Sequence, residues 1–577
     1  MKQRILSYQL AKYLKDQGVE VVFGLCGHTN IGFLDGLKNE GIRFITSRHE
    51  QVAAHMTDGY ARVTGKPAVL LTHLGPGLTN AATGVANAAL DSIPMIVIAG
   101  DVPSHYFGRH PHQEVNLHLD ADQFEIYRPF CKRIWRVERP SEFPRVIERA
   151  FHISKSGRSG TVLVDVPMDV FSAELPDGSF RNQPPKVVAG VDIETEAARQ
   201  IAHALVVAKK PLIHIGGGVI LSRASDELTN LVNWLGIPVT HTLMGKGGLS
   251  DAHPLNAGMT GFWGVPIANE LTKNADLILA AGTRFGETDS SSWDERFTFE
   301  IPPTRLIHLD IDVNEIGRNY PTELGVVCDV KKGFEKILIE VKKILPKPRC
   351  DNVLQQKIQD GRLSFANRWA EQRISSQFPL KPDRILADLR QALPEDGIVV
   401  TDVGWNKNGV GQQFPITIPG TFITPGGLAT MGFGPAAALG VKLAAPHRKV
   451  VALIGDGAFS SNMSVMATAA EANIPVTWIV MDNKAFGTIA LLQKHHYETF
   501  FGTLFERGGE PYGIEYAQVA RACGIDGFKV EAAEDLLPVL KKAIQSEKPT
   551  LVHVPMENVP TPTPGHWNIN DIYRKGS

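Results

Sequence analysis

The chain has 577 residues, more than one hydrophobic core supports, so we expect three domains. Its 59 basic and 61 acidic residues leave a net charge of -2 with no long block of one sign, so nucleic acid is not an expected partner. The five cysteines are scattered and form no CxxC pair, which argues against disulfides or zinc and favours a cytoplasmic location. No apolar run is long enough to span a membrane, and the first residues lack a secretory signal pattern.

The first predicted domain comprises residues 1–182. Short apolar runs at 19–25, 68–75, 94–100 and 160–167 alternate with stretches of helical spacing. Continuous β-branched runs between helices are typical of buried parallel strands. We therefore expect an α/β domain, followed by a proline-containing linker at residues 183–185.

The same pattern repeats twice more along the chain. The second predicted domain, residues 190–342, has apolar runs at 210–220, 236–243, 275–285 and 305–317. A polar segment at about 342–379 is expected to connect it to the third domain, residues 380–560, and to contain a helix. Residues 561–577 form a tail that is long enough to fold over an active-site mouth. The predicted fold class is thus α/β, with three doubly wound parallel-sheet domains.

The most informative motif lies in the third domain. Gly455, Asp456 and Gly457 follow one predicted strand, and Asn483 follows the next strand, 27 positions after Asp456. Neighbouring parallel strands bring such side chains to one edge of a sheet, where their oxygens can bind Mg²⁺. Glycines at the same edge allow the backbone to approach a phosphate. This spacing predicts a magnesium-diphosphate clamp.

A GDG sequence followed by an asparagine turn resembles the signature of thiamine-diphosphate-dependent enzymes. Further segments, such as RHEQVAAHMTDGYAR, TDVGWN and GGLATMGFGPAAALG, resemble the acetolactate synthase-like (pyruvate oxidase/decarboxylase) family over nearly the whole chain. The resemblance implies a pyrimidine-binding first domain, a central domain of flavin or nucleotide type, and a diphosphate-binding third domain. The metal ligands that it implies are Asp456, Asn483 and Ala485. The other implied cofactor contacts are Gly404, Trp405, Asn406, Gly427, Met431, Gly455, Gly457, Ala458, Phe486 and Gly487.

The first domain contributes an early glutamate, Glu50. By resemblance, this carboxyl shares a proton with the aminopyrimidine ring and thereby activates the thiazolium carbon. In the family, the residues that match Glu50 and Asp456 come from different subunits. The resemblance therefore implies a homodimer or homotetramer with active sites between subunits.

The middle domain resembles the flavin-contacting series of acetolactate synthases. The matching residues are Gly217, Thr242, Leu243, Arg284, Asp310 and Asp329. Trp263 stands where that series usually has histidine. We expect FAD in a structural role, with ADP as the alternative ligand of the same cleft.

Two positions depart from acetolactate synthases, because Thr288 and Leu492 occur where an arginine and a tryptophan recognise the second 2-oxo acid. His28, His73 and Gln113 lie in loops that the resemblance places over the thiazolium ring as catalytic candidates. This set is similar to the cyclohexane-1,2-dione hydrolase branch, in which a covalent thiazolium adduct of a diketone is cleaved. Cleavage or ligation of a carbon-carbon bond in a 2-oxo acid or 1,2-diketone is therefore the predicted reaction.

Three alternatives stay open. The chain could be the catalytic subunit of an acetolactate synthase. It could also be a lyase similar to 2-hydroxyacyl-CoA lyase or oxalyl-CoA decarboxylase, in which Arg574 and Lys575 of the tail meet the phosphates of an acyl-CoA substrate. The tail residues His566 and Trp567 are further contact candidates. A cofactor-binding scaffold without turnover is the third alternative, and the presence of Glu50, Asp456 and Asn483 argues against it.

Overall fold

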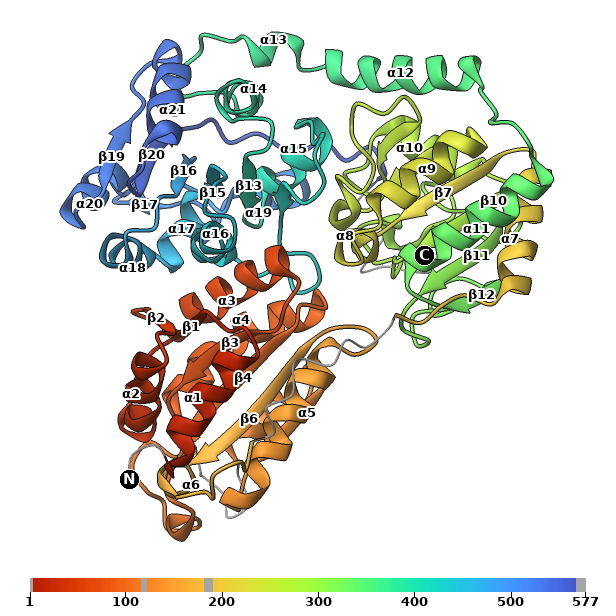
Figure 1. Cartoon of the computed structure of the whole chain (residues 1–577). Helices are drawn as coiled ribbons and strands as arrows, with labels where there is room; N and C mark the ends of the chain where they lie inside the picture. Colours follow the sequence, from red (N-terminus) through yellow and green to blue (C-terminus); the bar gives the residue numbers. More distant parts are fainter. Residues whose placement is uncertain (1–3, 116–121, 181–189, 567–577) are drawn as a thin grey trace.

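The computed structural model describes residues 4–115, 122–180 and 190–566, and it confirms the predicted α/β class (Figure 1). It contains three sheets of six strands, and the strand pairs within each of them are parallel. The linker predicted at residues 183–185 and the tail candidates Trp567, Arg574 and Lys575 lie outside the described residues.

The first domain is built on a sheet with the strand order β2-β1-β3-β4-β6-β5. The central strands β3 and β4 are buried at every position, as their continuous apolar runs predict. The strands are β1 Val21–Gly24, β2 Arg43–Thr46, β3 Ala68–Thr72, β4 Met95–Asp101, β5 Arg133–Arg136 and β6 Thr161–Pro167. The helices are α1 Leu6–Asp16, α2 Ile31–Asn39, α3 Glu50–Thr64, α4 Pro76–Leu90, α5 Phe143–Lys155 and α6 Met168–Ser172.

The third domain repeats this topology, since its order β14-β13-β15-β16-β20-β19 matches the first sheet strand for strand. Its strands are β13 Ile398–Thr401, β14 Phe422–Ile423, β15 Val450–Gly455, β16 Thr477–Asp482, β19 Asp526–Lys529 and β20 Thr550–Pro555, with a hairpin of β17 Glu506–Arg507 and β18 Glu510–Pro511. Its helices are α14 Pro382–Ala392, α15 Trp405–Gln413, α16 Phe433–Ala444, α17 Asp456–Ser461, α18 Val465–Ala472, α19 Gly487–Tyr497, α20 Tyr516–Ala522 and α21 Leu536–Gln545.

The middle domain has a different order, β12-β11-β10-β7-β8-β9. Counted from its own first strand, this is the order of dinucleotide-binding folds, in which ligands bind where the order reverses, here between β7 and β10. The strands are β7 Pro211–Ile215, β8 Val239–His241, β9 Asn256–Met259, β10 Leu277–Ala281, β11 Arg305–Asp310 and β12 Leu324–Val327. The helices are α7 Thr195–Val207, α8 Gly217–Leu221, α9 Ser225–Leu235, α10 Pro266–Lys273 and α11 Val330–Ile344.

The first and third domains pack against each other through α3 and α16 (Figure 1). A Cβ at Gly59 would lie 2.3 Å from the Ala437 oxygen, and one at Gly440 would lie 1.9 Å from the Met56 oxygen. Only glycine therefore allows the two helices to approach this closely. One hydrophobic cluster includes buried residues of both domains, so they share a continuous core.

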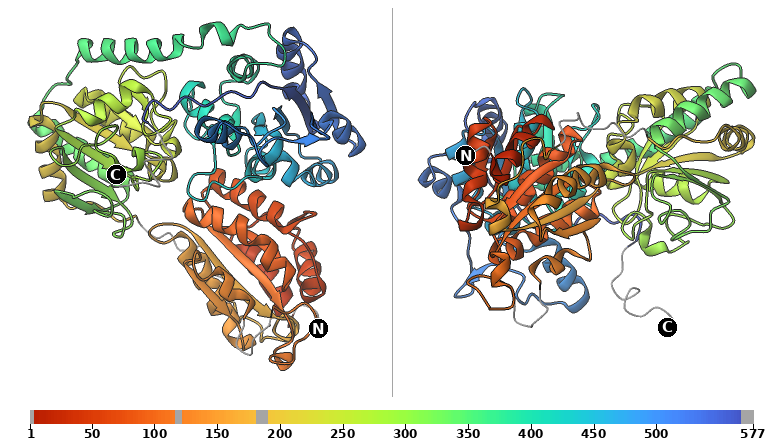
Figure 2. Two further views of the ribbon diagram at one scale, coloured as in Figure 1. Left: turned by 180° about the vertical axis from the view of Figure 1, so that it is seen from behind. Right: turned by 60° about the horizontal axis from the view of Figure 1, so that its bottom comes forward.

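The polar connecting segment forms α12 Asn352–Asn367 and α13 Ala370–Arg373. These helices run from the middle domain to the third domain along one side of the molecule, as both Figure 1 and the reverse view in Figure 2 show. Among the described residues, no helix combines the length and the apolar character that crossing a membrane requires.

Candidate active site

Three oxygen atoms meet at the carboxyl ends of β15 and β16. The side-chain oxygen of Asn483 lies 3.2 Å from Asp456 Oδ1 and 3.0 Å from the Ala485 backbone oxygen, while the Asn483 amide donates to Asn558 Oδ1 at 3.1 Å. An amide flip would give Asn483 two acceptors for its NH₂ group, but it would turn its oxygen toward another amide oxygen. The first orientation is the one that a divalent cation bound between these oxygens would stabilise.

The Asp456 carboxyl is buried at this site. Burial and the neighbouring Asp482 carboxylate raise the pKa of Asp456 above its usual range. Burial alone would also raise the pKa of Asp482, but the 2.8 Å hydrogen bond with His553, the interaction with Asp456 and the backbone at Lys484 together hold that pKa below its usual value. Such a pair of acids needs compensating positive charge, which a proton or a metal ion on Asp456 would supply. Among the described residues, no cluster of three His, Cys, Asp or Glu side chains is arranged for a metal, so the amide and carbonyl oxygens are essential to this one.

The predicted diphosphate turn lies beside this oxygen cluster. Gly404 has a φ of 115°, which favours glycine, and it precedes α15. The Asn406 side chain accepts a 3.0 Å hydrogen bond from the Asp402 backbone, and its amide lies 3.9 Å from the Cβ position of Gly455. Trp405 is largely buried in the core of the third domain, so its backbone is the part available to a phosphate.

The other predicted contacts in this domain surround the oxygen cluster. A Cβ at Gly457 would lie 2.8 Å from the Phe486 ring, and a Cβ at Gly487 would lie 2.4 Å from the Asn483 amide. Ala458 follows on α17 and is buried. Both glycines thus leave room that a larger residue would fill.

Gly427 and Met431 lie on the loop that leads into α16. The Asp91 carboxylate of the first domain accepts hydrogen bonds from the backbone of Gly426 at 3.0 Å and of Gly427 at 2.5 Å, and it pairs with Arg62 at 2.6 Å. Met431 is 41% exposed, which is unusual for an apolar side chain next to a site. The loop is therefore anchored at one end and uncovered at the other.

The predicted residues of the first domain form a second cluster. Glu50 is buried, and its carboxylate accepts a 3.0 Å hydrogen bond from Asn80. A Cβ at Gly77 would lie 3.2 Å from His73 Cβ and 3.7 Å from Glu50 Oε1, so the two side chains border the same glycine. The cluster lies at the carboxyl end of β3, which is the edge that the sequence predicts.

His73 connects this cluster to the other two candidates. Its Nε2 lies 3.1 Å from Gln113 Oε1, its Nδ1 lies 2.8 Å from Thr29 Oγ1, and its ring meets that of His28 at a centroid distance of 4.6 Å. Burial lowers the pKa of His73, although the hydrogen bond with Gln113 acts against this effect. A neutral His73 is therefore favoured near pH 7.

The Glu50 cluster and the Asp456 cluster are separated within one chain. Gly59 meets Ala437 and Met56 meets Gly440, so α3 and α16 are antiparallel. Helix α16 starts at the diphosphate half, and its 12 residues span about 18 Å. Because Glu50 is the first residue of α3, it lies toward the far end of α16.

A cavity of about 1520 Å³ lies between the three domains, at the switch point of the middle sheet. It is lined by all six flavin candidates, namely Gly217, Thr242, Leu243, Arg284, Asp310 and Asp329, together with Trp263, Thr288 and Gly427. Gly216, which precedes the flavin candidate Gly217, has a packing role, because a Cβ at this position would lie 2.2 Å from the Gly282 oxygen.

The polar side chains of the cavity wall differ in their hydrogen-bond partners within the protein. Burial raises the pKa of Asp310 to about 6, which suits a carboxyl that can share a proton with a ligand hydroxyl. Asp329 caps α11 by accepting from Lys331 N at 2.8 Å. Arg284 donates to the Leu90 oxygen of the first domain at 2.9 Å. A dinucleotide fits the size of the cavity, its strand order and its mixture of donors and acceptors.

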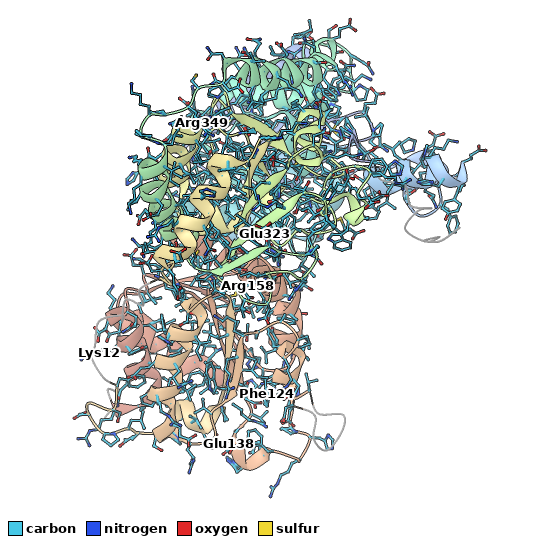
Figure 3. The ribbon with its side chains drawn as sticks, turned by 90° about the vertical axis from the view of Figure 1, so that its right-hand side faces the viewer. Lys12, Phe124, Glu138, Arg158, Glu323 and Arg349 are labelled. Carbon is cyan, nitrogen blue, oxygen red and sulfur yellow. The ribbon has the colours of Figure 1, made fainter. Side chains whose placement is uncertain are left out.

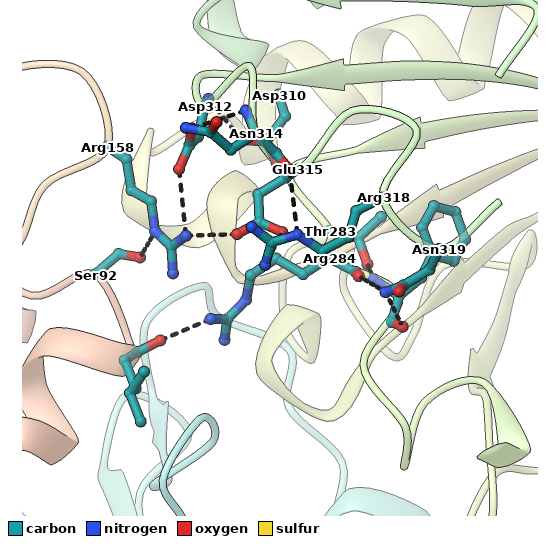
Figure 4. Close-up of polar contacts among 12 residues, drawn as sticks. Ser92, Arg158, Thr283, Arg284, Asp310, Asp312, Asn314, Glu315, Arg318 and Asn319 are labelled. Atoms are coloured by element: carbon teal, nitrogen blue, oxygen red, sulfur yellow. Dashed lines mark hydrogen bonds and ion pairs between the residues drawn. The ribbon is translucent and has the colours of Figure 1, made fainter. Parts of the chain in front are cut away.

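Arg158 of the first domain also borders this cavity, where the first domain meets the middle domain (Figure 3). It contacts Glu315 at 2.6 Å and Asp312 at 3.3 Å, and it donates to Ser92 Oγ at 2.8 Å (Figure 4). Its partner Glu315 is nearly buried. The sequence gives no signal for this ion pair, because its partners lie 157 positions apart.

Three further side chains, which were not predicted from the sequence, hold the metal candidates. Asp482 and His553 form the pair beneath Asp456, and Asn558 bonds to Asn483. Asp482 was visible beside Asn483 in the MDN motif, but nothing in the sequence indicated that β20 would bring His553 next to it. The tail candidate His566 stacks on Phe297 of the middle domain at 4.4 Å.

Family models match all three parts of the chain. They are the N-terminal TPP binding domain of thiamine pyrophosphate enzymes at residues 6–126, the central domain at 198–337, and the C-terminal TPP binding domain at 402–554. Thiamine pyrophosphate is another name for thiamine diphosphate. The chain belongs to the family of thiamine-diphosphate-dependent enzymes, in its acetolactate synthase-like group.

Several proteins with sequences similar to this chain are named acetolactate synthases. The "Probable acetolactate synthase large subunit" of Methanocaldococcus jannaschii is 33% identical, covering 96% of this chain and 93% of the relative. The acetolactate synthase of Arthrospira platensis is 35% identical over 97% and 96%, and isozyme 1 large subunit of Escherichia coli is 33% identical over 94% and 92%. These names favour the acetolactate synthase alternative and give no support to the diketone hydrolase branch.

Proposed function

We propose that this protein is a thiamine-diphosphate-dependent carboligase, which decarboxylates a 2-oxo acid and transfers the remaining carbon unit to a second carbonyl compound. This is the reaction type of an acetolactate synthase catalytic subunit. The observation that carries the proposal is the convergence of the Asp456, Asn483 and Ala485 oxygens, in a chain that aligns with acetolactate synthases almost from end to end.

The residues of the third domain fit a magnesium-diphosphate group. Asp456, Asn483 and Ala485 would hold the cation, and the turn at Gly404 would approach the phosphates. When bound, thiamine diphosphate supplies the nucleophilic carbon and the electron sink that cleavage next to a carbonyl requires. Glu50, oriented by Asn80, would hold and return a proton at the aminopyrimidine nitrogen.

The central cavity is proposed to hold FAD in a structural role, with ADP as the alternative. Its volume, its six matching residues and the dinucleotide-type strand order support this assignment. Copurified flavin in an enzyme whose activity does not change on flavin reduction would agree with it. Fully active enzyme that contains ADP or no nucleotide would contradict it.

A homodimer or homotetramer is proposed as the active unit. The separation of Glu50 from Asp456 within one chain supports this proposal. Apolar side chains beside the diphosphate half are exposed, such as Met431 at 41% and Ile489 at 56%, and a second copy would cover them.

Cleavage of a 1,2-diketone is the second candidate. The observation that favours it is the contact of His73 with both His28 and Gln113 next to Glu50, because this polar group could orient a neutral dicarbonyl or a water molecule. Thr288 and Leu492 also leave the second 2-oxo acid without the guanidinium and indole of the relatives.

One preparation can test both candidates. Acetolactate formation from pyruvate and loss of cyclohexane-1,2-dione are measured with and without thiamine diphosphate, for wild type and for Glu50→Gln and His73→Ala. The proposal predicts acetolactate formation that needs the cofactor and falls about 100-fold or more in Glu50→Gln. Diketone loss that depends on His73, without acetolactate formation, would reverse the order of the candidates. No turnover of either substrate would support the non-catalytic scaffold.

A further inference from the structure

Lys407 is a buried cation next to the proposed diphosphate turn. It follows Asn406 on α15, it is 8% exposed, and it lines the central cavity together with Leu243, Thr288 and Gly427. Within the described parts of the chain, no hydrogen bond or ion pair to its ammonium group is seen. A buried ammonium group has three donors to satisfy, so this arrangement indicates an acceptor that the protein does not provide.

The nearby carboxylates act on Lys407 only through space. Burial lowers the pKa of Lys407, and Asp91, Asp289 and Asp402 act against this effect. Each carboxylate already has other donors, namely Arg62 for Asp91, the Leu243 backbone for Asp289 and the Gly434 backbone for Asp402. They help to keep the lysine charged but leave its donors available to the cavity.

We propose that Lys407 binds a negatively charged oxygen of a small molecule in this cavity, and that the molecule is the carboxylate of a 2-oxo acid substrate. This inference rests on the proposed carboligase function. Lys407 lies in the first turn of α15, directly after the turn that would face the diphosphate, and it also lines the cavity, so one short segment connects the two sites. Thr288, where the relatives have an arginine, lines the same cavity, and Lys407 would replace the missing positive charge there. A phosphate oxygen of the FAD diphosphate would present the same negatively charged acceptor from a second source.

The test compares Lys407→Met, which keeps the length of the side chain and removes its charge, with wild type in the complete holoenzyme. Pyruvate binding and KM are measured beside those of butane-2,3-dione, which replaces the carboxylate with a neutral acetyl group. The dissociation constant of FAD is measured by flavin fluorescence. Lys155→Met is the matched control, because Lys155 is an exposed lysine at the rim of the same cavity.

Loss of a charge-assisted hydrogen bond should weaken pyruvate binding about 10-fold or more in Lys407→Met, with changes below about twofold for butane-2,3-dione, for FAD and in Lys155→Met. Weaker FAD binding with unchanged pyruvate binding would assign the lysine to the flavin and overturn the substrate assignment. Unchanged binding of both ligands would overturn the anchor itself. If Lys407→Met does not fold, Lys407→Gln replaces it. Wild-type enzyme that binds pyruvate without turnover would reject the carboligase proposal. Weaker pyruvate binding in Lys407→Met would still support the anchor in that case.

Discussion

The antiparallel packing of α3 and α16 predicts that two inactive variants restore each other. Glu50→Gln removes the proton-transfer group, and Asp456→Ala removes the metal ligand, so each homodimer should be inactive. If Glu50 of one subunit works with Asp456 of its partner, a mixed dimer contains one intact site and one site with both substitutions. Random mixing in equal amounts makes about half of the dimers mixed, so activity should return to about a quarter of wild type in the whole mixture and to about half in isolated mixed dimers.

The need for two chains follows from the separation of Glu50 and Asp456 within one chain. The length of α16, about 18 Å, separates Glu50 from the Asp456 cluster within one chain. At this distance the two groups of one chain would not contact the same cofactor molecule, so a second chain has to supply one of them. The two variants are coexpressed with different tags, mixed dimers are isolated by two affinity steps, and acetolactate formation and bound thiamine diphosphate are measured. Mixed dimers that stay as inactive as the parents would refute the reasoning and place both groups in one chain.

Three further changes test other parts of the structure. Gly440→Ala places a Cβ 1.9 Å from a backbone oxygen of α3, so thermal unfolding should show a free energy of unfolding that is lower by about 1–3 kcal/mol. In the control Gly32→Ala the new Cβ lies 3.4 Å from its nearest neighbour, so the stability should change little. Equal effects of the two substitutions would contradict the packing argument. Burial lowers the pKa of His55 from 6.5 to about 3, so the contribution of the neutral ring to stability is present above pH 6.5 and is lost as the pH falls. Between pH 6.5 and pH 5, the free energy of unfolding of wild type should fall by about 2 kcal/mol relative to that of His55→Leu. Parallel curves of stability against pH for the two proteins would argue against this. Arg158→Met removes the 2.6 Å partner of the buried Glu315 and leaves it only Arg318 at 3.2 Å, so hydrogen exchange around β11 should accelerate. Unchanged protection would show that the pair with Arg158 contributes little.

The sequence predicted those features that depend on order along the chain. The apolar runs identified the central strands, and the spacing of Asp456 and Asn483 predicted that neighbouring strands would bring them together, as β15 and β16 do. The lengths of the runs could not predict strand order, so the identical topology of the first and third sheets was not foreseen. The dinucleotide-type order of the middle sheet was likewise visible only in the structure.

Contacts between distant segments were beyond the reach of the sequence. His553 meets Asp482 because β20 pairs with β16, and a histidine in a buried strand has no local pattern that reveals its partner. Nothing in the sequence distinguishes Lys407 from a surface lysine, and only the position of α15 against the cavity does so. The sequence likewise gives no signal for the close contact at Gly59 and Gly440, which depends on how two helices from different domains pack.

The central cavity has walls from all three domains, so the dinucleotide proposed to bind there would link the lifetime of the whole protein to the supply of that ligand. A molecule bound there leaves when any one of the walls unfolds, so its binding free energy adds to the cost of opening each domain. At a free concentration about 100 times the dissociation constant, this addition is about 2.7 kcal/mol. Cells that are short of the ligand would therefore hold a chain that opens about 100-fold more often, and proteases would remove it sooner.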